Sequence, residues 1–354
     1  MDNSDFLFKL GRPISPLYSL AMSIRSFLYN KKILKSYSLS VPVISIGNLT
    51  MGGSGKTPVT MYLAKLLQKH GYRPAIISRG YGGKAKGQIN IVSNFDEVFL
   101  NPEQAGDEPF MLATSLQGVP VVTGKSRVHP CRYAIDTLKC DILLLDDGFQ
   151  HLSVNRDIDI VLFNATTLAG NSRVFPAGVL REPVTALKRC QAFVLTGVDE
   201  NNTERTTAFS SLLQTKFPDK PVFCAPISQY SVRSAESKTL ISKGSSLGKV
   251  FTFCAIANPI RFKNSLDSIG IDRVGFKTYK DHGKYSQNTM DTLCEIAIQK
   301  GATCLLTTQK DYVKIMDLAT SLPLHILEID LELPPSFGQF LFERLNCSNI
   351  QHIV

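Results

Sequence analysis

The chain has 354 residues, 44% hydrophobic and 19% charged, which predicts two folded domains and excludes long disordered segments. Its 39 Lys and Arg against 30 Asp and Glu give a net charge of +9, which favours an anionic partner such as a nucleotide, a phospholipid or a nucleic acid. The eight cysteines include no Cys-x-x-Cys pair, which argues against a disulfide framework or zinc site and favours reduced thiols in the cytosol.

Residues 1–40 are expected to form a membrane-associating N-terminal segment. The first five residues are acidic where a signal peptide is basic, and no apolar run reaches the ~18 residues of a membrane span. We therefore expect the protein to stay inside the cell without crossing the bilayer. An amphipathic helix is predicted over 16–35, with Ser15 as its N-cap and Pro16 as its first residue. Its apolar stripe comprises Leu17, Leu20, Ala21, Ile24, Phe27, Leu28 and Leu34.

Two interpretations of this helix remain open. It could pack on the core of the protein, or it could lie in the headgroup plane of a membrane. Four basic residues are predicted on or just beyond its polar side: Arg25, Lys31, Lys32 and Lys35. Each would contribute about 1 kcal/mol near an anionic leaflet. The pattern alone does not choose between the two interpretations.

Residues 41–221 predict an α/β domain. Short apolar runs alternate with helical stretches, one of them over 57–69, which is typical of a mostly parallel sheet with helices on both faces. The runs are Val41–Ile46, Pro74–Ser78, Val119–Val122, Asp141–Leu145, Ile158–Phe163 and Ala192–Leu195.

The pattern changes after residue 221. Residues 222–248, with two weak extended segments, predict a hairpin-like linker. Residues 249–354 predict a second, smaller α/β domain, with strands at 250–254, 303–307 and 325–329 and a helix near 286–299.

The strongest motif is a glycine-rich loop between a predicted strand and the helix over 57–69. Its residues are Gly52, Gly53, Ser54, Gly55, Lys56 and Thr57. Such a loop cradles phosphate oxygens with backbone N–H groups at a helix N-terminus. Lys56 would reach the β- and γ-phosphates and the Thr57 hydroxyl would ligate Mg²⁺. Thr50 stands where the strict motif has its first glycine, so the loop is a deviant P-loop.

A second motif supports the first. The strand over 141–145 ends in Asp146 and Asp147, as in a Walker B element, where one carboxylate holds Mg²⁺ through water and the other orients a ligand. Together the two motifs predict a site for Mg-ATP.

Further motifs occur in the order found in one family of lipid kinases. They are Gly47-Asn48-Leu49-Thr50, Ser78-Arg79-Gly80-Tyr81-Gly82-Gly83, Gly106-Asp107-Glu108-Pro109, Asp146-Asp147-Gly148-Phe149-Gln150-His151, Pro176-Ala177-Gly178, Leu180-Arg181-Glu182-Pro183, Asn258-Pro259 with Arg261-Phe262, Asp281-His282 and Lys310-Asp311. From about Ser15 to Lys314 the chain resembles the tetraacyldisaccharide 4′-kinase family of the lipid A pathway.

The resemblance implies a substrate, a location and partners. The γ-phosphate of ATP would be transferred to the 4′-hydroxyl of a tetraacylated glucosamine disaccharide 1-phosphate. The protein would be peripheral to the cytoplasmic face of the inner membrane, held there by its N-terminal helix. Neither nucleic acid nor an obligate protein partner is expected.

The resemblance also implies roles for single residues. Asp107 would accept the proton of the sugar hydroxyl, and His282, from the second domain, would be its partner. Arg181 would join Lys56 at the reacting phosphate, because a planar guanidinium suits phosphate. The residues implied near the substrate or the Walker B carboxylates are Arg79, Arg127, Glu108, Gln150 and His151. Ala257, Gly283 and Gln309 depart from the family pattern in the second domain.

Other classes fit the residues less well. A P-loop GTPase or metallochaperone-like switch lacks an Asn-Lys-x-Asp element, since Thr308-Gln309-Lys310-Asp311 has the wrong spacing. A nucleic-acid-binding ATPase would need clustered basic residues with aromatics, and the basic residues here are dispersed. A structural membrane protein with an inactive loop would not need Lys56, Thr57 and Asp146 together.

Overall fold

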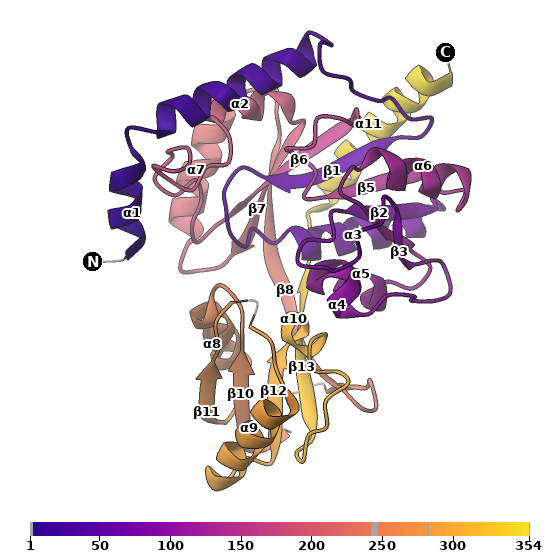
Figure 1. Cartoon of the computed structure of the whole chain (residues 1–354). Coiled ribbons are helices and arrows are strands. Elements are labelled where there is room, and N and C mark those ends of the chain that lie inside the picture. The colour runs from indigo at the N-terminus through magenta and orange to yellow at the C-terminus, as the bar shows by residue number, and fades with distance from the viewer. Residues whose placement is uncertain (1–2, 242–246, 282, 354) are drawn as a thin grey trace.

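The structure, a computed structural model, describes residues 3–241, 247–281 and 283–353. Its strands form one sheet in the order β11-β10-β12-β13-β8-β7-β6-β1-β5-β2-β4-β3, with β9 paired to β8. The sheet passes through two domains, the larger above and the smaller below in Figure 1. The predicted fold class is confirmed: a mostly parallel P-loop-type sheet joined to a second, smaller α/β unit.

The first domain contains parallel strands and one antiparallel edge strand, β3. Its strands are β1 (Val43–Asn48), β2 (Pro74–Ser78), β3 (Asn90–Ser93), β4 (Val121–Thr123), β5 (Ile142–Asp146), β6 (Ile158–Asn164) and β7 (Ala192–Val198). Its helices are α3 (Lys56–Lys69), α4 (Pro102–Ala105), α5 (Asp107–Ser115), α6 (Val128–Asp136), the 3₁₀ helix η1 (Val184–Arg189) and α7 (Thr203–Lys216).

Both faces of this sheet are covered, which explains why its central strands are continuous apolar runs. Ile44 and Ile46 of β1 pack in one core with α3 and α5. On the other face Val43 packs with α6, and the apolar side chains of β6 and β7 pack with η1 and α7. Because the strands are parallel, their carboxyl ends meet at one edge of the sheet, where ligands bind in such folds.

The second domain repeats the arrangement on a smaller scale. Its elements are β9 (Leu240–Ile241), β10 (Val250–Cys254), α8 (Pro259–Ser268), β11 (Arg273–Thr278), α9 (Gln287–Gln299), β12 (Cys304–Thr308), α10 (Gln309–Tyr312) and β13 (Leu324–Leu331). Helix α8 covers one face of its sheet and α9 the other. Strand β11, which was not predicted, is only partly buried and lies at the edge of the sheet.

The segment predicted as a linker is part of the sheet. Strand β8 (Val222–Ser234) begins parallel to β7 in the first domain and continues antiparallel to β13 in the second. Its end also pairs with β9, Val232 opposite Ile241, which is a hairpin pairing. Residues 242–246 lie outside the described part.

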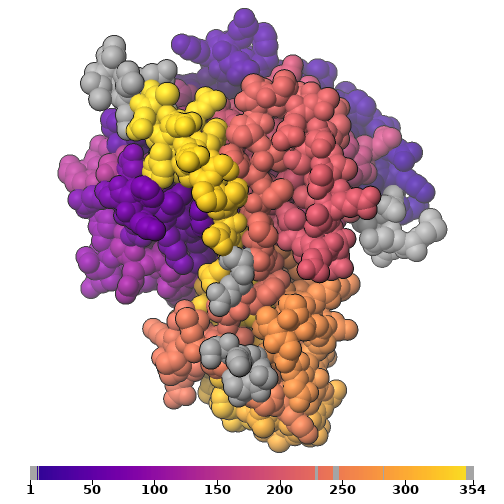
Figure 2. All heavy atoms as spheres, turned by 180° about the vertical axis from the view of Figure 1, so that it is seen from behind, coloured from indigo at the N-terminus to yellow at the C-terminus, as the bar shows by residue number. Residues whose placement is uncertain are grey.

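The C-terminal helix α11 (Pro335–Ile353) returns to the first domain. Its Phe337, Leu341 and Leu345 are buried in the core that contains Val59 and Leu63 of α3. Figure 2 shows this yellow helix lying on the larger domain. The sequence-based division assigned all of 249–354 to the second domain, but α11 packs with the first because its apolar face is shared with the P-loop helix.

The N-terminal segment forms α1 (Asn3–Gly11) and α2 (Ser15–Asn30) along the outside of the first domain (Figure 1). One predicted detail is wrong. Ser15 is not the N-cap, a position held by Ile14, and instead donates to the Val174 carbonyl at 2.7 Å. On the polar side of the helix, Arg25 donates to the Gln150 carbonyl at 2.9 Å.

The apolar stripe of α2 points away from the protein. Leu17 is 68% exposed and Phe27 54%, and Leu20 and Ile24 lie between them on the same face. Among the described residues, no helix is both long enough and apolar enough to span a bilayer.

Candidate active site

The glycine-rich loop lies between β1 and α3, as its sequence predicts. Gly55 adopts φ +75° at the start of α3 and Gly52 adopts φ +101°, a region that favours glycine. Neighbouring strand ends hold the loop, because Asn164 donates to the Gly53 carbonyl at 3.2 Å and Thr196 to the Ser54 carbonyl at 2.8 Å. A Cβ added to Gly52 or Gly53 would meet nothing within 4 Å, so this side of the loop is open to a ligand.

Lys56 joins the loop to the acidic pair. Its ammonium donates to Asn48 Oδ1 at 3.2 Å and lies 3.5 Å from Asp147 Oδ1. Thr57, the predicted metal ligand, is nearly buried at the next position. The lysine and the hydroxyl therefore lie at the carboxyl edge of the sheet, facing the end of β5.

The two carboxylates after β5 have different surroundings. Asp146 is 2% exposed, and burial together with the charges of Glu108 and Asp147 raises its pKa to about 7. Asp147 has φ +51°, and its Oδ1 and Oδ2 accept hydrogen bonds from Nη1 of Arg181 at 2.9 and 3.0 Å. Burial favours a raised pKa for Asp147, but Lys56 and Arg181 outweigh it and hold the pKa below its usual value. Asp146 is thus the carboxylate more in need of a cation.

Asp107 is the first residue of α5. Gly106 before it has φ +92°, and a Cβ there would lie 2.5 Å from the Tyr81 carbonyl. Glycine thus lets the loop after β2 pack directly on the start of α5. Across the domain boundary, Asp107 Oδ2 lies 3.6 Å from Nζ of Lys314, and Glu108 Oε1 lies 3.5 Å from Nζ of Lys310.

His282, the predicted partner of Asp107, lies outside the described residues. That pairing stays a prediction.

The remaining predicted substrate residues lie near the end of β5. Arg127 is 1% exposed and donates to the Gly124 carbonyl at 3.1 Å. Burial and the positive charges of Arg127 and Arg79 lower the pKa of His151 to about 4, although Asp147 opposes this. His151 is therefore neutral at pH 7. Gln150 donates to the Asn48 carbonyl at 3.1 Å and lies 3.4 Å from Arg181.

Comparison with known proteins decides the family. A family model described as tetraacyldisaccharide-1-P 4′-kinase matches residues 7–346. The chain belongs to this family. A tetraacyldisaccharide 4′-kinase of Desulfotalea psychrophila is 47% identical over 92% of this chain and 93% of its own length, and one of Syntrophus aciditrophicus is 36% identical over 97% and 94%.

The fold comparison agrees with the sequence comparison. A crystal structure of LpxK from Aquifex aeolicus in complex with ATP superposes with a TM-score of 0.75 at 30% identity, covering 94% of this chain and 98% of that one. The resemblance to the 4′-kinase family that the motifs indicated is therefore confirmed over nearly the whole chain.

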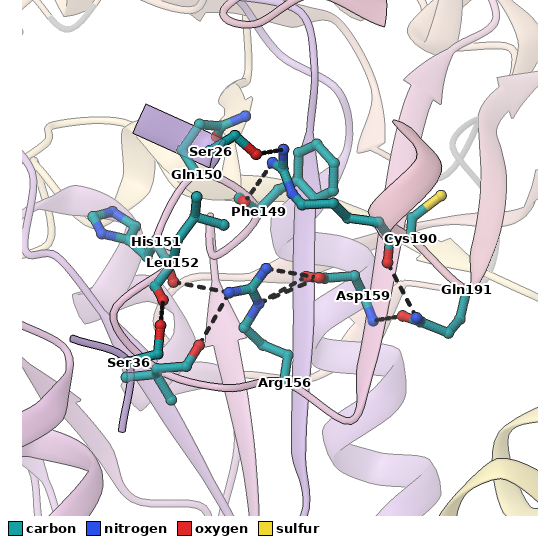
Figure 3. Close-up of polar contacts among 12 residues, drawn as sticks. Ser26, Ser36, Phe149, Gln150, His151, Leu152, Arg156, Asp159, Cys190 and Gln191 are labelled. Atoms are coloured by element: carbon teal, nitrogen blue, oxygen red, sulfur yellow. Dashed lines mark hydrogen bonds and ion pairs between the residues drawn. The ribbon is translucent and has the colours of Figure 1, made fainter. Parts of the chain in front are cut away.

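In this 4′-kinase family member, a polar network holds the loop that carries Gln150 and His151 (Figure 3). Arg156 donates to the carbonyls of His151 and Val154 and pairs with Asp159 at 2.9 Å. Arg189 donates to the Phe149 carbonyl at 3.3 Å and pairs with Glu182. The loop is thus fixed by hydrogen bonds from arginine side chains to its backbone carbonyls, which no sequence motif predicts.

Sequence reasoning assigned no role to several residues that lie at this site. Asn48 accepts a hydrogen bond from Lys56 through Oδ1 and donates one to the Thr50 carbonyl at 2.6 Å through Nδ2. Lys314 reaches Asp107 from the second domain. A lysine four positions after Lys310 carries no signal of its own, because only the fold brings it to Asp107. Gln309 donates to Ser115 at 2.8 Å across the domain boundary.

Proposed function

We propose that this protein transfers the γ-phosphate of ATP to the 4′-hydroxyl of a tetraacylated glucosamine disaccharide 1-phosphate, a step of lipid A biosynthesis. The observation that carries the proposal is the family match over residues 7–346 combined with a P-loop whose lysine lies 3.5 Å from Asp147. An ATP complex is known for the Aquifex aeolicus relative.

Mg²⁺ fits the residues at this edge of the sheet. Asp146 is a buried carboxylate beside two further acidic groups, and its oxygens and the Thr57 hydroxyl are the hard ligands that Mg²⁺ prefers. The described residues contain no cluster of three metal-ligating side chains, so nucleotide phosphates and water would complete the coordination. When bound, the ion would neutralise charge on the β- and γ-phosphates.

The proposed chemistry is a direct transfer. The 4′-oxygen forms a bond to the γ-phosphorus, the bond from that phosphorus to the β–γ bridging oxygen breaks, and ADP leaves. Asp107 accepts the hydroxyl proton, with His282 as its partner. Lys56 and Arg181 neutralise the charge of the transferred group, so catalysis is mainly positioning and electrostatic stabilisation.

We also propose that the protein is peripheral to the cytoplasmic face of the inner membrane. The apolar face of α2 turns outward, and three exposed lysines follow it, Lys31, Lys32 and Lys35. Helix α2 is anchored from its other side, where Tyr18 donates to the Arg181 carbonyl at 3.2 Å. A lipid surface at α2 would thus lie close to the loop that supplies Arg181.

The test is a transfer assay with Mg-ATP and a tetraacylated disaccharide 1-phosphate in detergent micelles. The wild type should form the 4′-phosphorylated lipid, GTP should substitute poorly, and EDTA should stop the reaction. Lys56→Ala and Asp107→Ala should each reduce kcat by about 10²-fold or more. Lys65→Ala, an exposed lysine on the same helix, should behave as wild type. A wild type that transfers no phosphate to this lipid refutes the function.

A further inference from the structure

Lys314 is a buried cation at the domain boundary. Its side chain is 7% exposed, and its ammonium lies 3.6 Å from Asp107 Oδ2 and 3.4 Å from Asp311 Oδ1. Asp107 belongs to the first domain, and the other two residues belong to the second. One ammonium group therefore connects a carboxylate of each domain.

The second-domain side of this contact is rigid. Asp311 is fully buried, and its Oδ2 accepts hydrogen bonds from the Ala255 backbone at 3.0 Å and the Thr308 hydroxyl at 2.8 Å. A carboxylate held by several donors cannot reorient without losing them. Asp311 therefore fixes the direction in which Lys314 points.

The other ion pairs across this boundary differ in exposure. Between described residues, Lys284 lies 3.9 Å from Glu103 with side chains 85% and 57% exposed, and Lys310 pairs with a Glu108 that is 40% exposed. Exposed pairs contribute little because water screens them. In the pair of Lys314 and Asp107, by contrast, the exposures are 7% and 24%, so the attraction is less screened.

We propose that Lys314 is a positioning residue for the catalytic carboxylate: Asp311 orients Lys314, and Lys314 holds Asp107 in the direction from which it accepts the hydroxyl proton. This inference rests on the proposed function, in which Asp107 is the acceptor. Lys314 belongs to the second domain, so Asp107 becomes fully oriented only when the two domains are together.

The test is a kinetic double-mutant cycle. Lys314→Met keeps the length of the side chain and removes its charge. We expect kcat to fall about 10- to 100-fold with little change in KM for ATP, and Lys314→Arg to recover much of the loss. In an Asp107→Asn background, Lys314→Met should lower kcat by less than about 2-fold, because the carboxylate that Lys314 orients is already absent. A merely structural lysine would cost the same factor in both backgrounds.

Lys284→Met is the matched control, since it removes another lysine that pairs across the same boundary, and it should retain wild-type kcat. Unchanged kcat in Lys314→Met, or an equal loss in both backgrounds, overturns the inference. If Lys314→Met melts well below wild type, Lys314→Gln and the Arg variant give the same comparison. Failure of the proposed function is distinct, because then the wild type itself would not phosphorylate the lipid.

Discussion

Arg127 is a buried cation whose position suits a ligand better than it suits the fold. Its Nε has no hydrogen-bond partner among the described residues. Burial lowers its pKa to about 10, although Asp146 and Asp147 act in the opposite direction, so it stays charged at pH 7. Such a group costs stability unless something anionic completes its contacts.

Replacing Arg127 should therefore separate stability from activity. We expect Arg127→Met to melt at the same temperature as wild type or higher, because an apolar side chain of similar length avoids burying a charge. Turnover should fall by about 10²-fold, as for loss of a preorganised charge. Thermal unfolding and the transfer assay measure both. A variant that loses stability but keeps kcat would make Arg127 a structural residue.

Two glycines of the phosphate loop offer a second residue-scale prediction. Gly53→Ala should leave the melting temperature unchanged, because a Cβ there meets nothing within 4 Å, but it should weaken ADP binding about 10-fold, since the backbone must approach phosphate closely. Gly55→Ala should lower both the melting temperature and the affinity for ADP, because Gly55 has φ +75° and a Cβ there would lie 3.1 Å from Thr196. Calorimetric titration with ADP and thermal unfolding distinguish the two, and equal melting temperatures would contradict the argument.

At this scale the sequence identifies residue types better than partners. The loop and the Asp146–Asp147 pair carry local motifs, so their meeting at one sheet edge could be predicted. The contact of Arg181 with Asp147 could not, because Arg181 lies in a loop whose path no sequence pattern fixes. The same reason explains Ser15, whose hydrogen bond goes to Val174, 159 residues away.

At the scale of elements, α2 is amphipathic in the opposite sense from an ordinary surface helix. Its half-buried side contacts the protein through polar and aromatic groups, such as Tyr18 and Ser26, while its apolar stripe is exposed. Periodicity predicted the stripe correctly but cannot say which side faces the protein. The side that faces the protein is set by the carbonyls of Val174 and Arg181, which accept hydrogen bonds from Ser15 and Tyr18.

The exposed stripe predicts membrane binding that can be removed without unfolding the enzyme. Leu20→Glu/Ile24→Glu should abolish co-sedimentation with vesicles containing anionic phospholipid, because two charges would enter the acyl boundary. Activity on a detergent-dispersed substrate and the melting temperature should change little, since both side chains are exposed. Ile298→Glu, a 52% exposed position on α9, is the control and should still bind. Vesicle binding retained by the double variant would rule out α2 as the anchor.

Helix α11 shows another limit of element-level prediction. Phe337 packs edge-on against Phe223 of β8 and Tyr62 of α3, so the chain's last helix supports the helix that follows the phosphate loop. Its apolar residues predict a buried face but not the domain that buries it. The domain division by chain order therefore differs from the division by packing.

For the whole molecule, the two domains are connected twice, by β8 and by the passage from β13 into α11. Alternating strands and helices predicted two α/β units, yet not that one strand pairs with strands of both domains, because pairing partners are not encoded in a single strand. Besides these two connections, Asp107 contacts Lys314 and Ser115 contacts Gln309 across the domain boundary.

Closure of the domains can be tested by preventing their separation. Ser115→Cys/Gln309→Cys places two thiols where a 2.8 Å hydrogen bond now joins α5 to α10, and a short bismaleimide would link them. The exposed Cys224 and Cys347 must first be replaced by Ser. Burial raises the pKa of Cys131, Cys140, Cys190 and Cys254 to about 12, so these thiols should not react.

If each catalytic cycle requires the domains to open for lipid and nucleotide exchange, the linked enzyme should lose most of its steady-state turnover relative to the same variant before linking. Each single-cysteine variant treated with the reagent should keep its activity, which separates linkage from simple modification. A linked enzyme that turns over at the unlinked rate would mean that the domains act as one rigid body. In that case Lys314 would hold Asp107 permanently, and the orientation of the carboxylate would not depend on closure.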